Sequence, residues 1–170
     1  MKLQCLALIV FVIAFAFAGT AMAQGDIFSD PSVNYSFALP DAKWKMTAKP
    51  SATNANVEYV YVDRSDGHLE VRKLRVARDA ILTDVIRDEE QRLRFNRGFV
   101  AGREENFTGK LRGSVFNFEY VSSGRSMSGR YYFLRADDTT VYMLRFSGEK
   151  DSLRSIKHYT DSIARTFSVK

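Results

Sequence analysis

The chain has 170 residues, of which 25 are Lys or Arg and 20 are Asp or Glu, so its formal net charge is +5. This small excess, with acids interspersed among the bases, is typical of a mixed solvent-facing surface, and a basic face for an anionic partner is the alternative. A single cysteine excludes a disulfide framework and a zinc site built from cysteine pairs. The length suits one domain with its own core.

The N-terminus predicts a cleavable secretory signal peptide over residues 1–23. Lys2 supplies a positive charge, residues 6–18 form an uninterrupted apolar run, and residues 21–23 (Ala-Met-Ala) are a small-x-small cleavage site. The apolar run is shorter than the ~20 residues that a membrane-spanning helix needs, although an uncleaved anchor is the alternative. Cleavage would also remove the only cysteine. We therefore expect an exported, periplasmic or extracellular protein without a disulfide-linked partner.

The remainder divides into a short lead-in and one domain. Residues 24–32 are polar and contain a proline, which predicts a flexible lead-in. Residues 33–168 contain no low-complexity segment at which to divide them, so they are expected to form a single domain. The alternation of apolar and small side chains over residues 35–39 predicts its first strand.

A β-hairpin is predicted from two runs rich in β-branched and aromatic residues, 57–62 and 69–76. Between them, Asp66-Gly67 would supply the positive φ that a tight turn needs. The apolar residues change face halfway along the second run, which predicts a bulge near Arg72-Lys73.

Two helices are predicted from apolar residues at spacings of three and four. The first begins near Ile81, with Thr83 or Asp84 as its cap, and ends at Gly98. The second covers residues 151–167, and its apolar stripe is expected to pack on a sheet rather than on a membrane surface.

Three strand-like runs lie between these helices, at residues 112–121, 129–135 and 140–146. Short polar links join them, which is typical of an antiparallel meander. Strands interrupted by one helix and closed by another predict an α+β fold, in which helices cover a mostly antiparallel sheet.

Aromatic residues recur along these elements in a set order. The segments are Tyr35-Ser-Phe-Ala-Leu-Pro40 with Trp44, Glu58-Tyr-Val-Tyr61, Gly109 and Gly113 before Phe118-Glu-Tyr120, Arg130-Tyr-Tyr-Phe133 with Val141-Tyr-x-Leu144, and Ile163-Ala-Arg-Thr-Phe167. This order resembles the Mog1/PsbP-like superfamily over residues 33–168. The resemblance implies an α/β/α sandwich with a central, mostly antiparallel sheet. It also implies a non-catalytic role, because members of the family act mostly as subunits or assembly factors of membrane complexes or as small binding proteins.

The residues of a catalytic or metal centre are sparse. No G-x-S-x-G turn and no H-E-x-x-H pair occurs, and the two histidines, His68 and His158, are expected on the surface. We therefore expect no enzyme, no cofactor, no catalytic residue and no metal site. The one candidate polar site is weak and would gather Asp63, Asp66 and His68 on the predicted hairpin around a cation.

The segment from Ser122 to Gly129 is predicted to be a long flexible loop. It carries Arg125 and Met127, which are candidate contacts for a partner. The alternative is a solvent-exposed loop that accepts sequence changes and has no binding role.

These observations favour an exported, non-enzymatic binding or assembly module that docks on a protein complex of the membrane or cell envelope. One alternative is a periplasmic carrier of a small apolar ligand or lipid, held between sheet and helix. A further alternative is an unrecognised hydrolase that uses Asp63, Asp66 and His68. A protein partner, a monomeric state and no nucleic-acid binding are expected.

Overall fold

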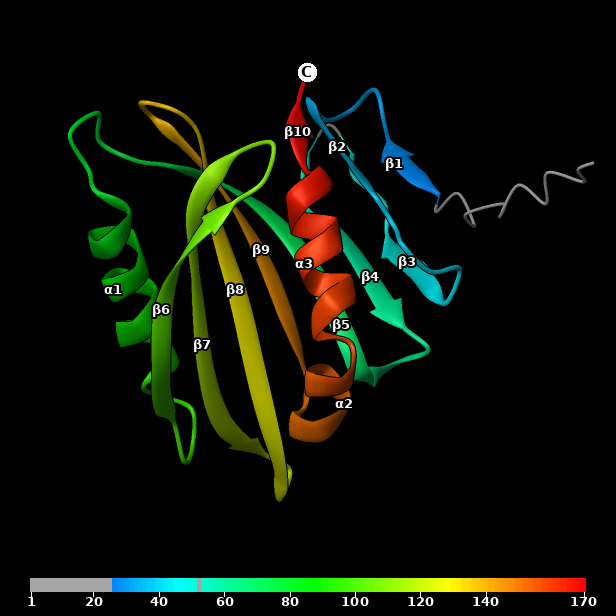
Figure 1. Ribbon diagram of the computed structural model, residues 1–170, viewed down its shortest axis with the longest axis vertical. Coiled ribbons are helices and arrows are strands. Elements are labelled where there is room, and N and C mark those ends of the chain that lie inside the picture. The colour runs from blue at the N-terminus through cyan, green and yellow to red at the C-terminus, as the bar shows by residue number, and fades with distance from the viewer. Residues whose placement is uncertain (1–25, 52) are drawn as a thin grey trace, which may run out of the picture.

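The computed structural model describes residues 26–51 and 53–170, and Figure 1 shows their arrangement. The predicted signal peptide lies outside these residues. The strands and helices are, in chain order, β1 (Ile27–Ser29), β2 (Tyr35–Ala38), β3 (Trp44–Ala48), β4 (Val57–Tyr61), β5 (Asp63–Arg75), α1 (Leu82–Leu93), β6 (Val100–Thr108), β7 (Arg112–Ser122), β8 (Arg125–Asp137), β9 (Thr140–Glu149), α2 (Lys150–Ser155), α3 (Lys157–Thr166) and β10 (Ser168–Val169).

A seven-stranded antiparallel sheet forms the middle of the domain, with the strand order β3-β4-β5-β9-β8-β7-β6. The predicted meander of β7, β8 and β9 is therefore confirmed. The hairpin of β4 and β5 joins it through the pairing of β5 with β9, which runs from His68↔Ser147 to Arg75↔Thr140. A second sheet, β1-β2-β10, brings the two ends of the described chain together.

Helices cover both faces of the large sheet (Figure 1). The central strand β9 explains why, since its apolar side chains alternate between the faces. Tyr142 and Leu144 belong to the core beneath α2 and α3, whereas Val141 and Met143 belong to the core beneath α1. A strand buried on both sides requires two covering layers. The α+β class and the α/β/α sandwich are thus confirmed.

The larger core lies beneath α2 and α3, where the small sheet also packs. Its fully buried side chains include Phe37, Leu69, Tyr132, Ile163 and Phe167. The smaller core lies beneath α1 and includes Ile86, Leu93, Phe116, Phe118 and Phe133.

The hairpin of β4 and β5 turns at a different place from the one predicted. Among the described residues, positive φ occurs at Val62 (59°) and not at Gly67. Tyr61 pairs with Asp63, and the register then shifts before Val60↔His68, so residues 64–67 form the irregular part of the hairpin. A β-branched residue with positive φ is uncommon, which is why the sequence pointed to the glycine instead.

The predicted bulge near Arg72-Lys73 is also wrong. The pairing of β5 with β9 continues through these residues without a register shift. Leu69 faces the core beneath α3, and Leu74 packs on the core beneath α1. The apolar pattern changes phase because the first half of the strand has its apolar side chains on the face covered by α2 and α3, and the second half has them on the face covered by α1.

The expected flexible lead-in is ordered from residue 26 onward. Residues 27–29 form β1, which pairs with β2 through Phe28↔Phe37. Phe28 is buried and its ring stacks on that of Phe37, with centroids 4.9 Å apart. Burial of this one aromatic side chain stabilises β1. The strand was not predicted, because the surrounding polar segment shows no alternation of apolar and polar residues. The ordered domain therefore extends beyond 33–168 at both ends.

Both helices are shorter than predicted. Helix α1 ends at Leu93, one turn before Gly98, and no side chain caps its N-terminus. The C-terminal helix is divided at Ile156 into α2 and α3, again without side-chain caps. The apolar stripe of the second prediction is confirmed, because Leu153, Ile156 and Ile163 are buried against the sheet.

The predicted loop from Ser122 to Gly129 is a tight hairpin instead. Strand β7 ends at Ser122, strand β8 begins at Arg125, and the two residues pair directly. Ser123 (φ 51°) and Gly124 (φ 76°) form the turn, and positive φ at both positions is what a type I′ turn requires. Within residues 26–51 and 53–170, no helix has the length and apolar composition to cross a membrane.

Candidate functional site

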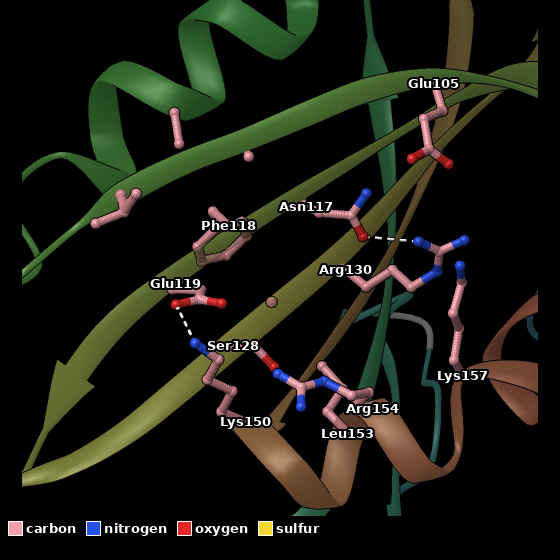
Figure 2. A pocket seen from close by; sticks show the side chains of 14 residues that line it. Glu105, Asn117, Phe118, Glu119, Ser128, Arg130, Lys150, Leu153, Arg154 and Lys157 are labelled. Carbon is pink, nitrogen blue, oxygen red and sulfur yellow. Dashed lines mark hydrogen bonds and ion pairs between the residues drawn. The ribbon is translucent and has the colours of Figure 1, made fainter.

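A groove of about 470 Å³ lies on the face of the sheet that α2 and α3 share, where these helices leave β6 and β7 uncovered. Figure 2 shows it from close by. Strand β6 forms one side, β7 and β8 form the floor, and α2 with the start of α3 forms the other side. Its polar and charged lining residues are Glu105, Asn117, Glu119, Ser128, Arg130, Lys150, Arg154 and Lys157.

Arg130 is the buried cation of the floor, with 8% of its surface exposed. Its Nη1 donates to Oδ1 of Asn117 (2.7 Å), its Nη2 to Oδ1 of Asp161 (2.8 Å) and its Nε to the hydroxyl of Tyr132 (2.6 Å). Burial opposes its charge, but the phenol and the carboxylate outweigh that effect and hold the pKa of Arg130 above its ordinary value. The guanidinium is therefore charged and held in one orientation.

Tyr132 links Arg130 to helix α3. Its hydroxyl donates to Oδ1 of Asp161 and lies 3.0 Å from Oγ1 of Thr160. Thr160 in turn donates to the carbonyl of Lys157 (2.8 Å). Burial raises the pKa of the Tyr132 phenol, so it stays neutral and keeps its proton for the carboxylate. None of the buried side-chain atoms in this network is without a hydrogen-bond partner, which is typical of polar groups that fix a structure.

Three cations stand along the helical side of the groove. Lys150 pairs with Glu119 across the floor (Nζ to Oε2, 2.7 Å), and Arg154 pairs with the exposed Asp151 of its own helix (3.3 Å). Lys157 makes no ion pair with any described residue. Glu105 lies on the β6 side (Figure 2). The groove therefore carries a surplus of positive charge.

Ser128 is the hydroxyl side chain in the lining of the groove, and among the described residues that line it there is no histidine or cysteine. Within the part of the chain that the structure describes, no three His, Cys, Asp or Glu side chains are placed to hold a metal ion. The arrangement suits reversible contact with charged groups.

A second polar cluster lies beneath α1. Arg145 donates to Glu70 (3.0 Å) and to the hydroxyl of Tyr131 (3.0 Å), and its Nη2 lies 3.8 Å from Oε1 of Glu89. Both carboxylates are buried. Buried charges are normally paired in this way, and here Glu89 attaches α1 to Arg145 of the sheet. The cluster could not be predicted from the sequence, because its members lie far apart in the chain.

The structure links Asp63 with Asp66 but does not gather both carboxylates around His68. Asp63 accepts hydrogen bonds from the backbone N–H (2.7 Å) and hydroxyl (2.6 Å) of Ser65 and from the backbone N–H of Asp66 (3.1 Å), and Asp66 accepts one from Ser152 (3.3 Å). His68 is buried, contrary to the prediction of a surface histidine, and its Nε2 lies 2.9 Å from Oε2 of Glu58. Each side chain thus serves its own local contact.

The two candidate contact residues lie at the start of β8. Nη1 of Arg125 lies 2.5 Å from Oε1 of Glu149, and Met127 is partly buried opposite Tyr120. Their role toward a partner stays a prediction. His158 is exposed, as predicted, and stacks against Tyr159.

No protein-family profile matches the chain, and no curated protein matches it in sequence. Solved structures do match it in fold. A cyanobacterial PsbP (CyanoP) from Synechocystis sp. PCC 6803 aligns with a TM-score of 0.60 at 16% identity, over 89% of this chain and 96% of that one. The chain has a Mog1/PsbP-like fold.

Two further structures share the Mog1/PsbP-like fold. The Ran-binding protein Mog1p of Saccharomyces cerevisiae aligns with a TM-score of 0.60 at 12% identity, over 85% of this chain and 95% of that one. LpqN of Mycobacterium tuberculosis, which is involved in cell envelope biogenesis, aligns with a TM-score of 0.56 at 12% identity, over 86% and 85%. At these identities the likeness concerns the fold alone.

Proposed function

We propose that this protein is an exported, non-enzymatic binding or assembly module that docks on a protein of the membrane or cell envelope through its groove. The groove carries the proposal, because it is an open surface of the central sheet with a surplus of positive charge. The signal-like residues 1–23 support export. Among proteins of the same fold, Mog1p binds Ran and LpqN is involved in envelope biogenesis, which supports a binding role.

A carrier of apolar ligands fits the structure less well. Such a carrier would hold its ligand between sheet and helix, but Tyr132, Ile163 and Phe167 fill that space and are fully buried. Several charged side chains line the groove beside its apolar surface, and an apolar ligand there would have to remove water from them without pairing them. A hydrolase would need Asp63, Asp66 and His68 to converge, and the contact of His68 with Glu58 instead opposes it.

Site-specific photo-crosslinking in living cells tests the docking surface. A photoreactive residue is placed at Val100 or at Ser128, on opposite sides of the groove floor, and at Lys45 on β3 as the control. We expect one envelope protein to be captured from both groove positions and not from Lys45. Capture of no protein, or equal capture from all three positions, would contradict the proposal.

The mass of the protein from the envelope fraction tests its export. We expect the mass of the chain that starts at Gln24, because cleavage follows the Ala-Met-Ala site. The mass of the whole chain in that fraction would mean a retained anchor, and a cytoplasmic protein of full mass would reject export.

A further inference from the structure

The cations of the groove form a row. Lys150, Arg154 and Lys157 follow one another at intervals of four and three residues, and Figure 2 shows all three side chains extending from α2 and the start of α3 toward the sheet. A helix rises 1.5 Å per residue, so successive cations of the row stand about 4.5 to 6 Å apart along the chain direction. An extended chain presents every second side chain on one face, about 6.6 Å apart. The long side chains of Arg154 and Lys157 can bridge the difference between these spacings.

The floor of the groove follows two neighbouring strands. Strands β7 and β8 form it and lie about 4.8 Å apart, so an extended chain can lie along their direction. Strand β6 is the edge of the sheet, and all of its residues except Phe107 are exposed, so its side of the groove is open to an incoming segment.

The charges in the groove select the partner. The carboxylate of Glu119 is already paired with Lys150, and Arg130 on the floor is paired with Asp161 of α3. Glu105 is the other carboxylate of the lining and lies on the β6 side, away from the helical cations. Arg154 has only a weak pair with Asp151, in which both side chains are mostly exposed, and Lys157 has no ion-pair partner among the described residues. These two side chains can turn to new carboxylates at little cost. A basic surface attracts an acidic partner and suppresses binding of a basic one.

We propose that the groove binds an extended segment of the partner protein that carries acidic side chains at alternate positions. The carboxylates pair with Arg154 and Lys157, and the backbone lies along the floor beside β6. This inference rests on the proposed function and adds the chemistry of the partner. An anionic lipid surface is less suitable, because the cations line the inside of a groove rather than a convex face.

Fluorescence anisotropy with synthetic peptides tests the inference on the protein purified from the envelope. The probe is a labelled octapeptide of alternating Glu and Thr. Its controls are an alternating Lys–Thr peptide and a peptide with four Glu followed by four Thr, which has the same charge without the spacing. We expect the alternating acidic peptide to bind most tightly, with an affinity that falls as salt is added.

Charge reversal identifies the site. We expect the variant R154E/K157E to bind the acidic peptide at least about tenfold more weakly, because two attractions become repulsions. The matched control K45E/R78E makes the same change of charge at two exposed positions away from the groove and is expected to bind as the wild type does. Equal urea midpoints of both variants and the wild type verify folding.

The outcomes separate this inference from the proposed function. Equal weakening in both variants, or equal affinity for both acidic peptides, would mean general charge attraction and would overturn the inference. Tighter binding to vesicles of anionic phospholipid than to any peptide would overturn it in favour of a membrane contact. If the envelope protein is still captured at Val100 by R154E/K157E with undiminished yield, docking stands and the acidic segment is rejected.

Discussion

Nη2 of Arg130 lies 2.8 Å from Oδ1 of Asp161, and this ion pair joins the middle of β8 to α3. The two residues are 31 positions apart in the chain. The pair places a buried cation under the groove but leaves it no freedom to move, because the other donors of the guanidinium are held by Asn117 and Tyr132. Arg130 therefore shapes the floor, whereas Arg154 and Lys157 are free to meet a partner.

Removal of the carboxylate from this pair is expected to destabilise the domain. In Asp161→Asn, Arg130 keeps its charge in a buried site without an anion, which costs about 2 kcal/mol of the free energy of unfolding. Urea denaturation measures the difference. The control is Asp151→Asn, which removes an exposed pair with Arg154 and is expected to leave the midpoint unchanged. Equal midpoints for Asp161→Asn and the wild type would mean that the pair contributes nothing.

Gly129→Ala is expected to strain the core beneath α1. A Cβ at this position would overlap the ring of Phe118, which is 2% exposed and cannot move outward. Overpacking of this kind costs about 1–3 kcal/mol. Thermal unfolding is expected to show a lowered Tm, and Phe118→Leu in the same chain is expected to cost less than it does alone. Additive effects of the two changes would show that the residues do not interact in this way.

The free energy of unfolding is expected to fall at alkaline pH. Burial raises the pKa of the Tyr59 phenol to about 12, whereas the unfolded chain titrates near 10. The phenol of Tyr59 therefore keeps its proton to higher pH in the native state than in the unfolded chain. Its contribution to the free energy of unfolding is complete below about pH 10 and is lost as the pH rises through about 12.

Tyr59→Phe tests the origin of this loss. Urea denaturation at about pH 8 and about pH 11 is expected to show a decline that is about 1 kcal/mol smaller in the variant than in the wild type. Part of the decline remains, because burial also raises the pKa values of Tyr35 and Tyr132. An identical decline in both proteins would mean that titratable groups other than Tyr59 cause the loss of stability.

Ser123→Asn is expected to stabilise the hairpin of β7 and β8. Ser123 has a φ of 51° beside Gly124, and Asn-Gly is the pair that a type I′ turn favours. A gain of about 0.5 kcal/mol in the free energy of unfolding is expected. Ser122→Asn, one residue earlier and inside β7, is the matched control and is expected to bring no gain. A gain from both substitutions would point to a cause other than the turn.

The sequence predicted the layers of the fold better than their connections. Runs such as 140–146 are apolar on both faces, and such runs require helices on both sides of a sheet. The turn at Val62 was not predictable, because a β-branched residue is among the last expected with positive φ. Strand β1 was not predicted because Phe28 is its one buried side chain, and a single apolar residue cannot show the alternation that predicts a strand.

The groove could be predicted only in part. Arg154 and Lys157 are three residues apart in the predicted helix over residues 151–167, so these two cations could be expected on one side of it. Lys150 lies before that predicted helix, and its place in the row could not be predicted. The groove also requires that α2 and α3 leave β6 and β7 uncovered, and that depends on how the sheet packs. Arg130 appeared in the sequence as one of several arginines on strands, and its burial depends on Asp161, in another element.

The last described residues complete a structure that begins with the first. Strand β10 pairs with β2 through Ser168↔Ser36, and the ring of Phe167 stacks on that of Tyr35, with centroids 5.2 Å apart. A chain that stops before these residues lacks one aromatic partner of both Tyr35 and Phe37, so the packing of the first strands is complete only when the chain reaches residue 169. The two ends of the described chain therefore depend on each other, and shortening either one weakens the packing of the other.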